Sequence, residues 1–163
     1  MIPASKQHVR NPKYPIDTVV LHAMEGTYRG SISWFESTDN IVGAHYCISK
    51  TGQVTQCAPD SVKLYHAGSK SRAGMNDRSI GVEQEMYSKD TSYPQAMLDE
   101  VVFIVAHLCY NHRIPCDTKH VIQHRDIPGV THTDCGDWYT EHVYPVVVSR
   151  AAEMLADMIE SSK

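Results

Sequence analysis

Long apolar runs are the first feature that the sequence lacks. A membrane-spanning helix needs roughly 18 consecutive apolar residues, whereas the longest apolar run here, residues 101–106, is bounded by Glu100 and His107. Met1 is followed by a segment without the apolar stretch that is typical of a secretory signal. We therefore expect no membrane segment, no membrane partner, and synthesis in a cytoplasm.

An excess of positive charge is also missing. The chain has 15 Lys and Arg residues against 19 Asp and Glu residues, which gives a net charge of −4 at pH 7. Electrostatic binding to nucleic acid needs a basic face that releases counterions from the phosphates. We therefore expect no nucleic-acid partner.

Closely spaced cysteine pairs are absent as well. The five cysteines are odd in number and form no Cys-x-x-Cys motif, which argues against a disulfide framework and against a zinc ribbon. Cys109 and Cys116 are the best candidates for a single disulfide. In a reducing compartment we expect all five thiols to be free.

What the chain does have is the composition of an ordinary globular protein. Its 163 residues are 42% hydrophobic and 21% charged, and no repeat or Gly/Ser linker divides them. We predict one domain over residues 1–163, with residues 1–15 as an irregular lead-in. Ten histidines are the unusual number, because imidazole is the commonest metal ligand and the usual acid–base group near neutral pH.

Strand patterns and helix patterns interleave along the chain. Strands are predicted at residues 16–22, 44–49, 53–57, 79–85 and 119–123, with a hairpin turn at Gly52. Helices are predicted at residues 31–37, about 93–112 and about 144–161, the second with Ser92 as its N-cap, and residues 124–138 are predicted to be a polar loop. This order predicts an α/β or α+β domain with a central mixed β-sheet flanked by helices.

Polar residues lie where the predicted core strands end. His22 closes the first strand, Glu83 lies within the strand at 79–85, and His124 closes the strand at 119–123, with Asp134 ten residues later. Loops at strand ends are where α/β proteins gather ligands and catalytic groups. Two imidazoles and one carboxylate would form an open zinc site with a place left for water.

In this hypothesis the remaining polar residues supply acid–base chemistry. Glu83 is the candidate that takes a proton from water and passes it to the leaving amine, and His132 could stabilise the oxyanion. Plainer interpretations stay open for each residue. A strand-end histidine is more often a hydrogen-bonded structural residue, and Asp134 beside Gly136 suits a turn. Glu83 could be a solvated strand residue, and His132 on its spacing alone is more often a surface residue.

Five segments match a known family in order. They are Thr18 to His22, the hairpin from Ala44 to Val54, Tyr65-His66-Ala67-Gly68, Asn76 with Ser79 to Glu83, and His124 to Gly136. Over about residues 16–140 the chain resembles the type 2 N-acetylmuramoyl-L-alanine amidases. This zinc family includes phage endolysins, AmpD-type recycling amidases and peptidoglycan recognition proteins.

The resemblance implies a role for each matched residue. His22, His124 and Asp134 would bind one Zn²⁺ per chain, and Glu83 would be the general base. His132 stands where AmpD-type members usually have lysine, and would stabilise the oxyanion only in a suitable protonation state. His66 is a candidate for substrate binding that could instead brace the cleft.

Two departures from the family pattern bear on the site. Cys135 replaces the proline of the Asp-Pro-Gly motif, and some members use cysteine as the third ligand, so Cys135 is a rival to Asp134. The spacing from His124 and the following Gly136 favour Asp134. Ala44 stands where phage members often carry a catalytic tyrosine, which puts more weight on Glu83.

The resemblance also implies the reaction, which is cleavage of the amide between the lactyl group of N-acetylmuramic acid and L-alanine in peptidoglycan or a muropeptide. We expect a monomeric phage endolysin or its catalytic domain, made in the host bacterial cytoplasm and reaching the cell wall at lysis. The alternatives are a cytoplasmic AmpD-type enzyme that recycles anhydromuropeptides and, from a different class, a non-catalytic peptidoglycan-binding module.

Overall fold

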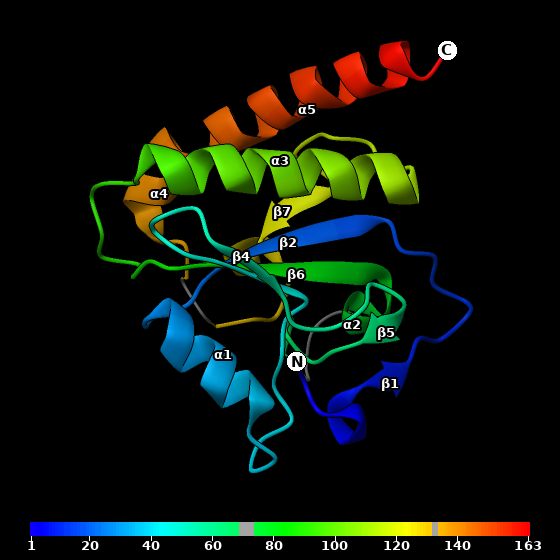
Figure 1. Cartoon of the computed structure of the whole chain (residues 1–163), viewed down its shortest axis with the longest axis vertical. Coiled ribbons are helices and arrows are strands. Elements are labelled where there is room, and N and C mark those ends of the chain that lie inside the picture. Colours follow the sequence, from blue (N-terminus) through cyan, green and yellow to red (C-terminus); the bar gives the residue numbers. More distant parts are fainter. Residues whose placement is uncertain (69–73, 132–133) are drawn as a thin grey trace.

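A five-stranded mixed sheet with helices on both sides forms the body of the molecule (Figure 1), as the sequence predicts. The structure is a computed structural model that describes residues 1–68, 74–131 and 134–163. The sheet has the order β4-β3-β6-β2-β7. Its strands are β2 (Thr18–Ala23), β3 (Tyr46–Ile48), β4 (Val54–Gln56), β6 (Ser79–Gln84) and β7 (Val121–Gln123). The helices are α1 (Tyr28–Glu36), α2 (Met75–Arg78), α3 (Gln95–His112), α4 (Gly136–His142) and α5 (Tyr144–Ser161).

Parallel pairing brings the ends of three strands together. β2 lies between β6 and β7 and runs parallel to both, while β3 is parallel to β6 and forms an antiparallel hairpin with β4. In this register His22 is opposite Glu83, and Leu21 is opposite Gln123. His124 follows Gln123 directly, so both histidines and Glu83 reach the same edge of the sheet.

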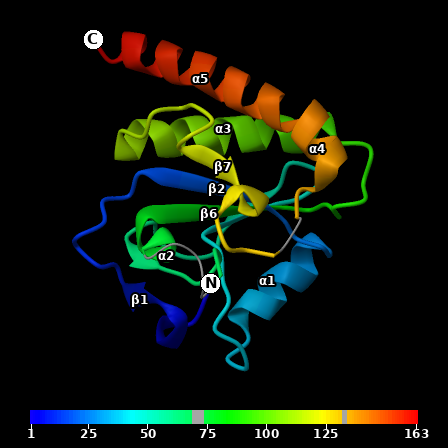
Figure 2. The same cartoon turned by 180° about the vertical axis from the view of Figure 1, so that it is seen from behind.

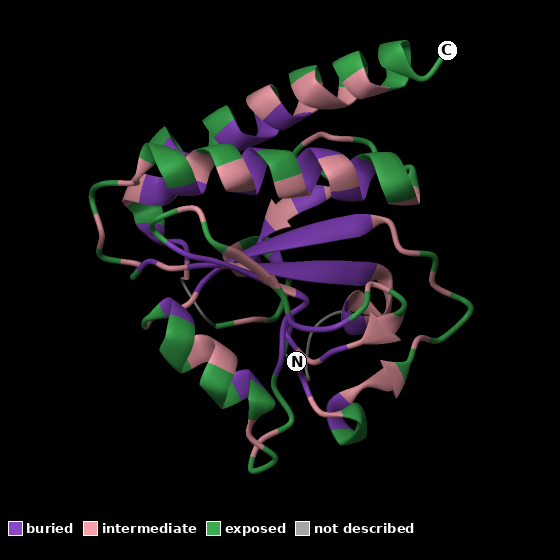
Figure 3. Cartoon of the chain, in the orientation of Figure 1, coloured by how far each residue is buried: buried purple, intermediate pink, exposed green. Residues whose placement is uncertain are grey.

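One face of the sheet is covered by α3, and α5 packs on the outer side of α3 (Figure 2). The contact is apolar: Leu21 and Val82 from the strands are fully buried against Val101 and Val105 of α3. Each such side chain contributes roughly 1.5–3 kcal/mol when it leaves water. Figure 3 shows β2 and β6 as deeply buried strands. Every residue of β2 is buried, and in β6 only Glu83 is half-buried.

Residues 1–15, predicted as an irregular lead-in, lie mostly outside regular elements but also contact the rest of the protein. They contain a 3₁₀ turn at Ala4–Lys6 and the strand β1 (His8–Val9), which pairs with β5 (Val62–Lys63). Lys6 is buried, and its ammonium donates to the Phe35 carbonyl at 2.6 Å. No local sequence pattern predicts these contacts, because the partners are distant in sequence.

Several predicted boundaries also differ from the structure. α1 begins at Tyr28 because Thr27 caps it by accepting from the Gly30 N–H at 3.2 Å. The N-cap of α3 is Pro94 and not Ser92. The predicted loop at 124–138 contains the 3₁₀ turn η2 (His124–Asp126) and the start of α4.

Two further expectations concern cysteines and membrane spans. All five cysteines have free thiols in the structure, as expected, Cys109 and Cys116 included. Within the three described ranges, no helix combines the length and the apolar character that a bilayer crossing requires.

Candidate active site

Three metal-ligand side chains converge at the edge where the parallel strands end. His22 Nδ1 lies 3.5 Å from Asp134 Oδ2, and His124 Nδ1 lies 2.8 Å from Asp134 Oδ1. One ligand atom from each residue falls within 4.8 Å of the other two. Both histidines are buried, and the Asp134 side chain is 12% exposed. The structure thus brings together the three residues that the sequence predicts as ligands.

Local structure explains how the chain delivers Asp134 to this place. Directly after it, Cys135 and Gly136 both have left-handed backbone conformations, with φ of 73° and 64°. A Cβ at Gly136 would lie 1.9 Å from the Ser88 carbonyl oxygen, so only glycine fits there. This sharp turn leads into α4, and Asp134 is the residue directly before the turn.

Cys135, the rival third ligand, is turned away from the cluster. Its thiol is fully buried and lies 3.4 Å from the Leu21 carbonyl oxygen, to which it donates. Burial raises the pKa of this thiol well above its ordinary value, helped by the charge of Asp134. The direction of the thiol, toward the Leu21 carbonyl, favours Asp134 over Cys135 as the third ligand.

The charge of Asp134 is fixed by the two imidazoles. Burial alone would raise the pKa of this carboxyl, but the two imidazoles beside it, His124 and His22, outweigh that effect and hold the pKa well below its usual range. Two imidazoles and one carboxylate are a donor set that Zn²⁺ uses, with a further position left for water. The residues present therefore fit this ion.

Glu83 lies beside the cluster in an unusual environment. It pairs with His22 across β2 and β6, and with Cys47 across β6 and β3. Among the described residues its Oε2 atom is buried and has no hydrogen-bond partner. Burial, followed by the charge of Asp134, raises the pKa of Glu83 to about 8. Such a carboxyl is poised to exchange protons near neutral pH.

His66 is the neighbour of the cluster on its inner side. One ring nitrogen, Nδ1, lies 3.0 Å from His22 Nε2, and the other, Nε2, lies 3.2 Å from Ser79 Oγ. The residue is buried, and burial followed by the proximity of His22 lowers its pKa well below the ordinary value. Protein atoms therefore engage both nitrogens.

A second buried histidine, His45, lies next to His66, with ring centroids 5.6 Å apart. His45 Nδ1 accepts a hydrogen bond from the Gly81 N–H at 3.1 Å, and its Nε2 lies 3.0 Å from the Arg10 guanidinium. Burial, reinforced by Arg10, lowers the pKa of His45 to about 4. Our sequence reasoning missed Arg10, which has no motif to mark it, and gave no role to Ser79, although Ser79 lies in one of the matched segments. His132, the predicted oxyanion stabiliser, lies outside the described residues.

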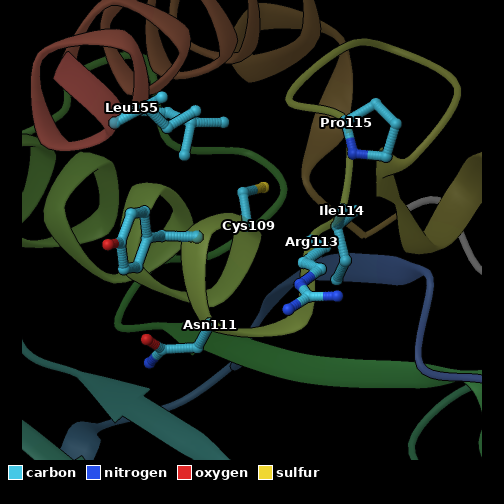
Figure 4. Close-up of a pocket in the computed structure, with 8 residues that line it drawn as sticks. Cys109, Asn111, Arg113, Ile114, Pro115 and Leu155 are labelled. Atoms are coloured by element: carbon cyan, nitrogen blue, oxygen red, sulfur yellow. The ribbon is translucent and has the colours of Figure 1, made fainter. Parts of the chain in front are cut away.

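A hollow of about 380 Å³ opens beside Glu83 and runs along α1. Its wall includes Thr27, Trp34 and Val42, and the Trp34 side chain is 55% exposed. A second hollow, of about 680 Å³, lies between the end of α3 and α5 (Figure 4). None of its eight described lining residues is a histidine or carries a carboxylate. Of these two hollows, only the smaller is lined by one of the candidate site residues, Glu83.

Comparison with known proteins gives a consistent result. Residues 12–137 match the sequence model of the family described as N-acetylmuramoyl-L-alanine amidase. N-acetylmuramoyl-L-alanine amidase A from Achromobacter lyticus is 31% identical over 116 residues, which cover 70% of this chain and 63% of that protein.

Solved structures share the fold at lower identity. The amidase AmiD from E. coli, in complex with the substrate anhydro-N-acetylmuramic acid-L-Ala-D-gamma-Glu-L-Lys, has a TM-score of 0.70 at 21% identity, over 84% of this chain and 58% of AmiD. PlyL has a TM-score of 0.72 at 17% identity, over 92% of each chain. This chain thus spans about three fifths of the length of the Achromobacter enzyme and of AmiD.

Proposed function

Because the chain belongs to the N-acetylmuramoyl-L-alanine amidase family, we propose that it is a zinc-dependent hydrolase acting on peptidoglycan or muropeptides. It cleaves the amide between the lactyl group of N-acetylmuramic acid and L-alanine, with residues 1–163 as one catalytic domain. The observation that carries this proposal is the convergence of His22, His124 and Asp134 next to Glu83. The substrate held by AmiD joins a muramic acid to L-alanine.

In this proposal the three converging residues hold one Zn²⁺. The bound ion supplies Lewis-acid chemistry, which polarises the scissile carbonyl and acidifies a water molecule. Glu83 accepts a proton from the attacking water as the new C–O bond forms. As the C–N bond breaks, Glu83 returns that proton to the departing amine of L-alanine. The pKa of about 8 belongs to the zinc-free protein. A bound cation nearby would lower it and favour the carboxylate form, which must accept the proton in the first step.

The oxyanion stabiliser in this proposal is His132, which rests on the family resemblance. The protonated imidazole would donate to the oxygen that gains charge in the transition state. A His132→Lys variant carries a fixed charge at neutral pH, so its rate should depend less on pH than that of the wild type. Superimposable pH–rate profiles would remove His132 from this role.

The test of the proposed function is mass spectrometry of the products released from purified sacculi. Wild-type protein loaded with Zn²⁺ should release stem peptides with a free L-alanine amine, and Glu83→Gln should release none above background. Glu85→Gln is the matched control, because the Glu85 carboxylate accepts from the Tyr28 and Lys50 backbone N–H groups. It should lower stability and keep cleavage.

For the biological role we propose action on intact cell wall, as by a phage endolysin. Support comes from the rim of the Glu83 hollow, where Trp34 and Val42 are exposed and can meet a large substrate. The competing role is the recycling of soluble anhydromuropeptides in a bacterial cytoplasm. Release from soluble fragments but not from sacculi would favour recycling, and binding without release from either would indicate a non-catalytic binding module.

A further inference from the structure

A series of polar contacts, His22–His66–Ser79–Met75, leads into the protein interior, and we call it the relay. His22 Nε2 lies 3.0 Å from His66 Nδ1, and His66 Nε2 lies 3.2 Å from Ser79 Oγ. The Ser79 hydroxyl in turn donates to the Met75 carbonyl oxygen at 2.6 Å. All three side chains are buried, so water does not compete for these contacts.

The Ser79–Met75 contact, at the inner end of the relay, determines which atoms of the relay carry the protons. A carbonyl oxygen only accepts, so the single hydroxyl proton of Ser79 goes to Met75. Ser79 Oγ must then accept from the Nε2–H of His66. A neutral imidazole that donates from Nε2 accepts at Nδ1, so His22 donates from its own Nε2. Neutral His22 is left with its lone pair on Nδ1, the atom that faces Asp134.

We propose that His66 and Ser79 are positioning residues that hold His22 in the tautomer whose Nδ1 can bind a metal ion. This inference rests on the zinc site of the proposed function. It also gives His66 a bracing role rather than contact with the substrate.

The proposal has an energetic basis, because His22 faces two competing acceptors. Without the relay, a proton on Nδ1 would make a charge-assisted hydrogen bond to the Asp134 carboxylate, and Zn²⁺ would have to displace it. The relay offers the proton an acceptor on the opposite side of the ring. Metal-ligating histidines depend in general on a partner of this kind at the second nitrogen.

The backbone around His66 is built to hold the ring in place. A Cβ at Gly81 would lie 2.7 Å from the His66 ring, so the imidazole lies directly on the β6 backbone. Asn76 Oδ1 accepts from the N–H groups of His66 and Ala67, at 3.2 and 2.9 Å. These contacts fix both the backbone from which the His66 side chain extends and the plane of the His66 ring.

Zinc affinity gives the first test, measured by competition between the protein and a chromophoric chelator for Zn²⁺. Loss of an outer partner of a metal ligand typically costs about 10–100-fold in affinity, and His66→Leu should fall in that range. His66→Asn should stay closer to the wild type, because its Oδ1 can accept near the position of Nδ1. Ser79→Ala should have a smaller effect than His66→Leu.

A matched control separates positioning from general destabilisation. His45→Leu makes the same change at a buried histidine that contacts His66 but no predicted ligand. It should lower the melting temperature of the zinc-free protein at least as much as His66→Leu, with a change in zinc affinity below about threefold. Equal losses of affinity in the two variants would overturn the proposal.

The second readout is the tautomer of His22, observed by long-range ¹H–¹⁵N NMR on zinc-free protein. The wild type should carry the proton on Nε2, and Ser79→Ala and His66→Leu should move population to Nδ1. A wild-type proton on Nδ1, or an unchanged tautomer in folded Ser79→Ala, would overturn the inference. Neither readout needs cleavage, so a protein that binds zinc in this way but releases no stem peptide would contradict only the proposed function.

Discussion

The two faces of the central sheet are both buried, yet they are built from opposite kinds of side chain. On the face toward α3, β2 and β6 present residues such as Leu21 and Val82. On the other face the same two strands present His22, Gly81 and Glu83 to a layer of buried histidines. The pleat of the strands alone separates the two sets, because successive side chains point to opposite faces.

This difference shows that burial has two different effects on free energy within one sheet. The apolar face gains free energy from every side chain that leaves water. The polar face gains little, since a buried polar group costs free energy unless it finds a hydrogen-bond partner. We infer that the apolar face sets the stability of the fold, and that the polar face is maintained for chemistry. Variants of neighbouring residues can test this division.

The largest effect should follow removal of the proposed ligand Asp134. Asp134→Ala deletes the carboxylate that faces both histidines, and should weaken Zn²⁺ binding by more than the 100-fold that is typical of outer partners. Cys135→Ala changes the next residue, whose thiol points to the Leu21 carbonyl, and should keep affinity within about threefold. Chelator competition on both variants measures the contrast. The reverse order would make Cys135 the third ligand.

A pair of adjacent residues on β2 gives the next largest effect. Leu21→Ala removes a fully buried side chain and should lower the free energy of unfolding by about 2–5 kcal/mol. His22→Ala, one residue later on the opposite face, should lower it less in the zinc-free protein and should abolish zinc binding. Urea unfolding without metal, followed by zinc titration, separates the two outcomes. Equal losses of stability would refute the division between the faces.

The apolar face is the part of the fold that the sequence predicts well. α5 has its predicted bounds because Val147 and Ala151 recur at helical spacing, and β6 is found where β-branched residues alternate with polar ones. Such periodicity is a local property of the chain, and burial on one side is enough to create it. Element ends are less accurate, as at Pro94, because a cap depends on single contacts.

The polar face is only partly accessible to sequence reasoning. The order of the motifs predicts that His22, His124 and Asp134 meet, and the structure brings them together. The buried contacts behind these residues are not predictable in the same way. Arg10 reaches His45 across 35 positions, and Ser79 reaches His66 across 13. Contacts at such separations follow no period, so only the folded backbone reveals them.

The buried carboxyl of Glu83 should make the polar face a pH-dependent cost to stability. Its pKa rises from 4.5 to about 8 on folding, so the folded state holds a proton that the unfolded state has lost. The free energy of unfolding of zinc-free protein should therefore fall as pH rises through this window. Glu83→Gln should flatten the slope and be more stable than the wild type above pH 8, by several kcal/mol. The same difference in free energy of unfolding between the two proteins at pH 5 and at pH 8.5 would contradict this prediction.

The smallest expected effects come from single methyl-sized changes on neighbouring residues of β6. Ile80→Val removes one carbon from the apolar face and should cost about 0.5–1.5 kcal/mol of stability, with zinc affinity unchanged. Gly81→Ala adds one carbon to the polar face, where it would lie 2.7 Å from the His66 ring. The ring must then move, so zinc affinity should fall even where the loss of stability is no larger than for Ile80→Val. Equal zinc affinities in the two variants would show that the polar face tolerates repacking as the apolar face does.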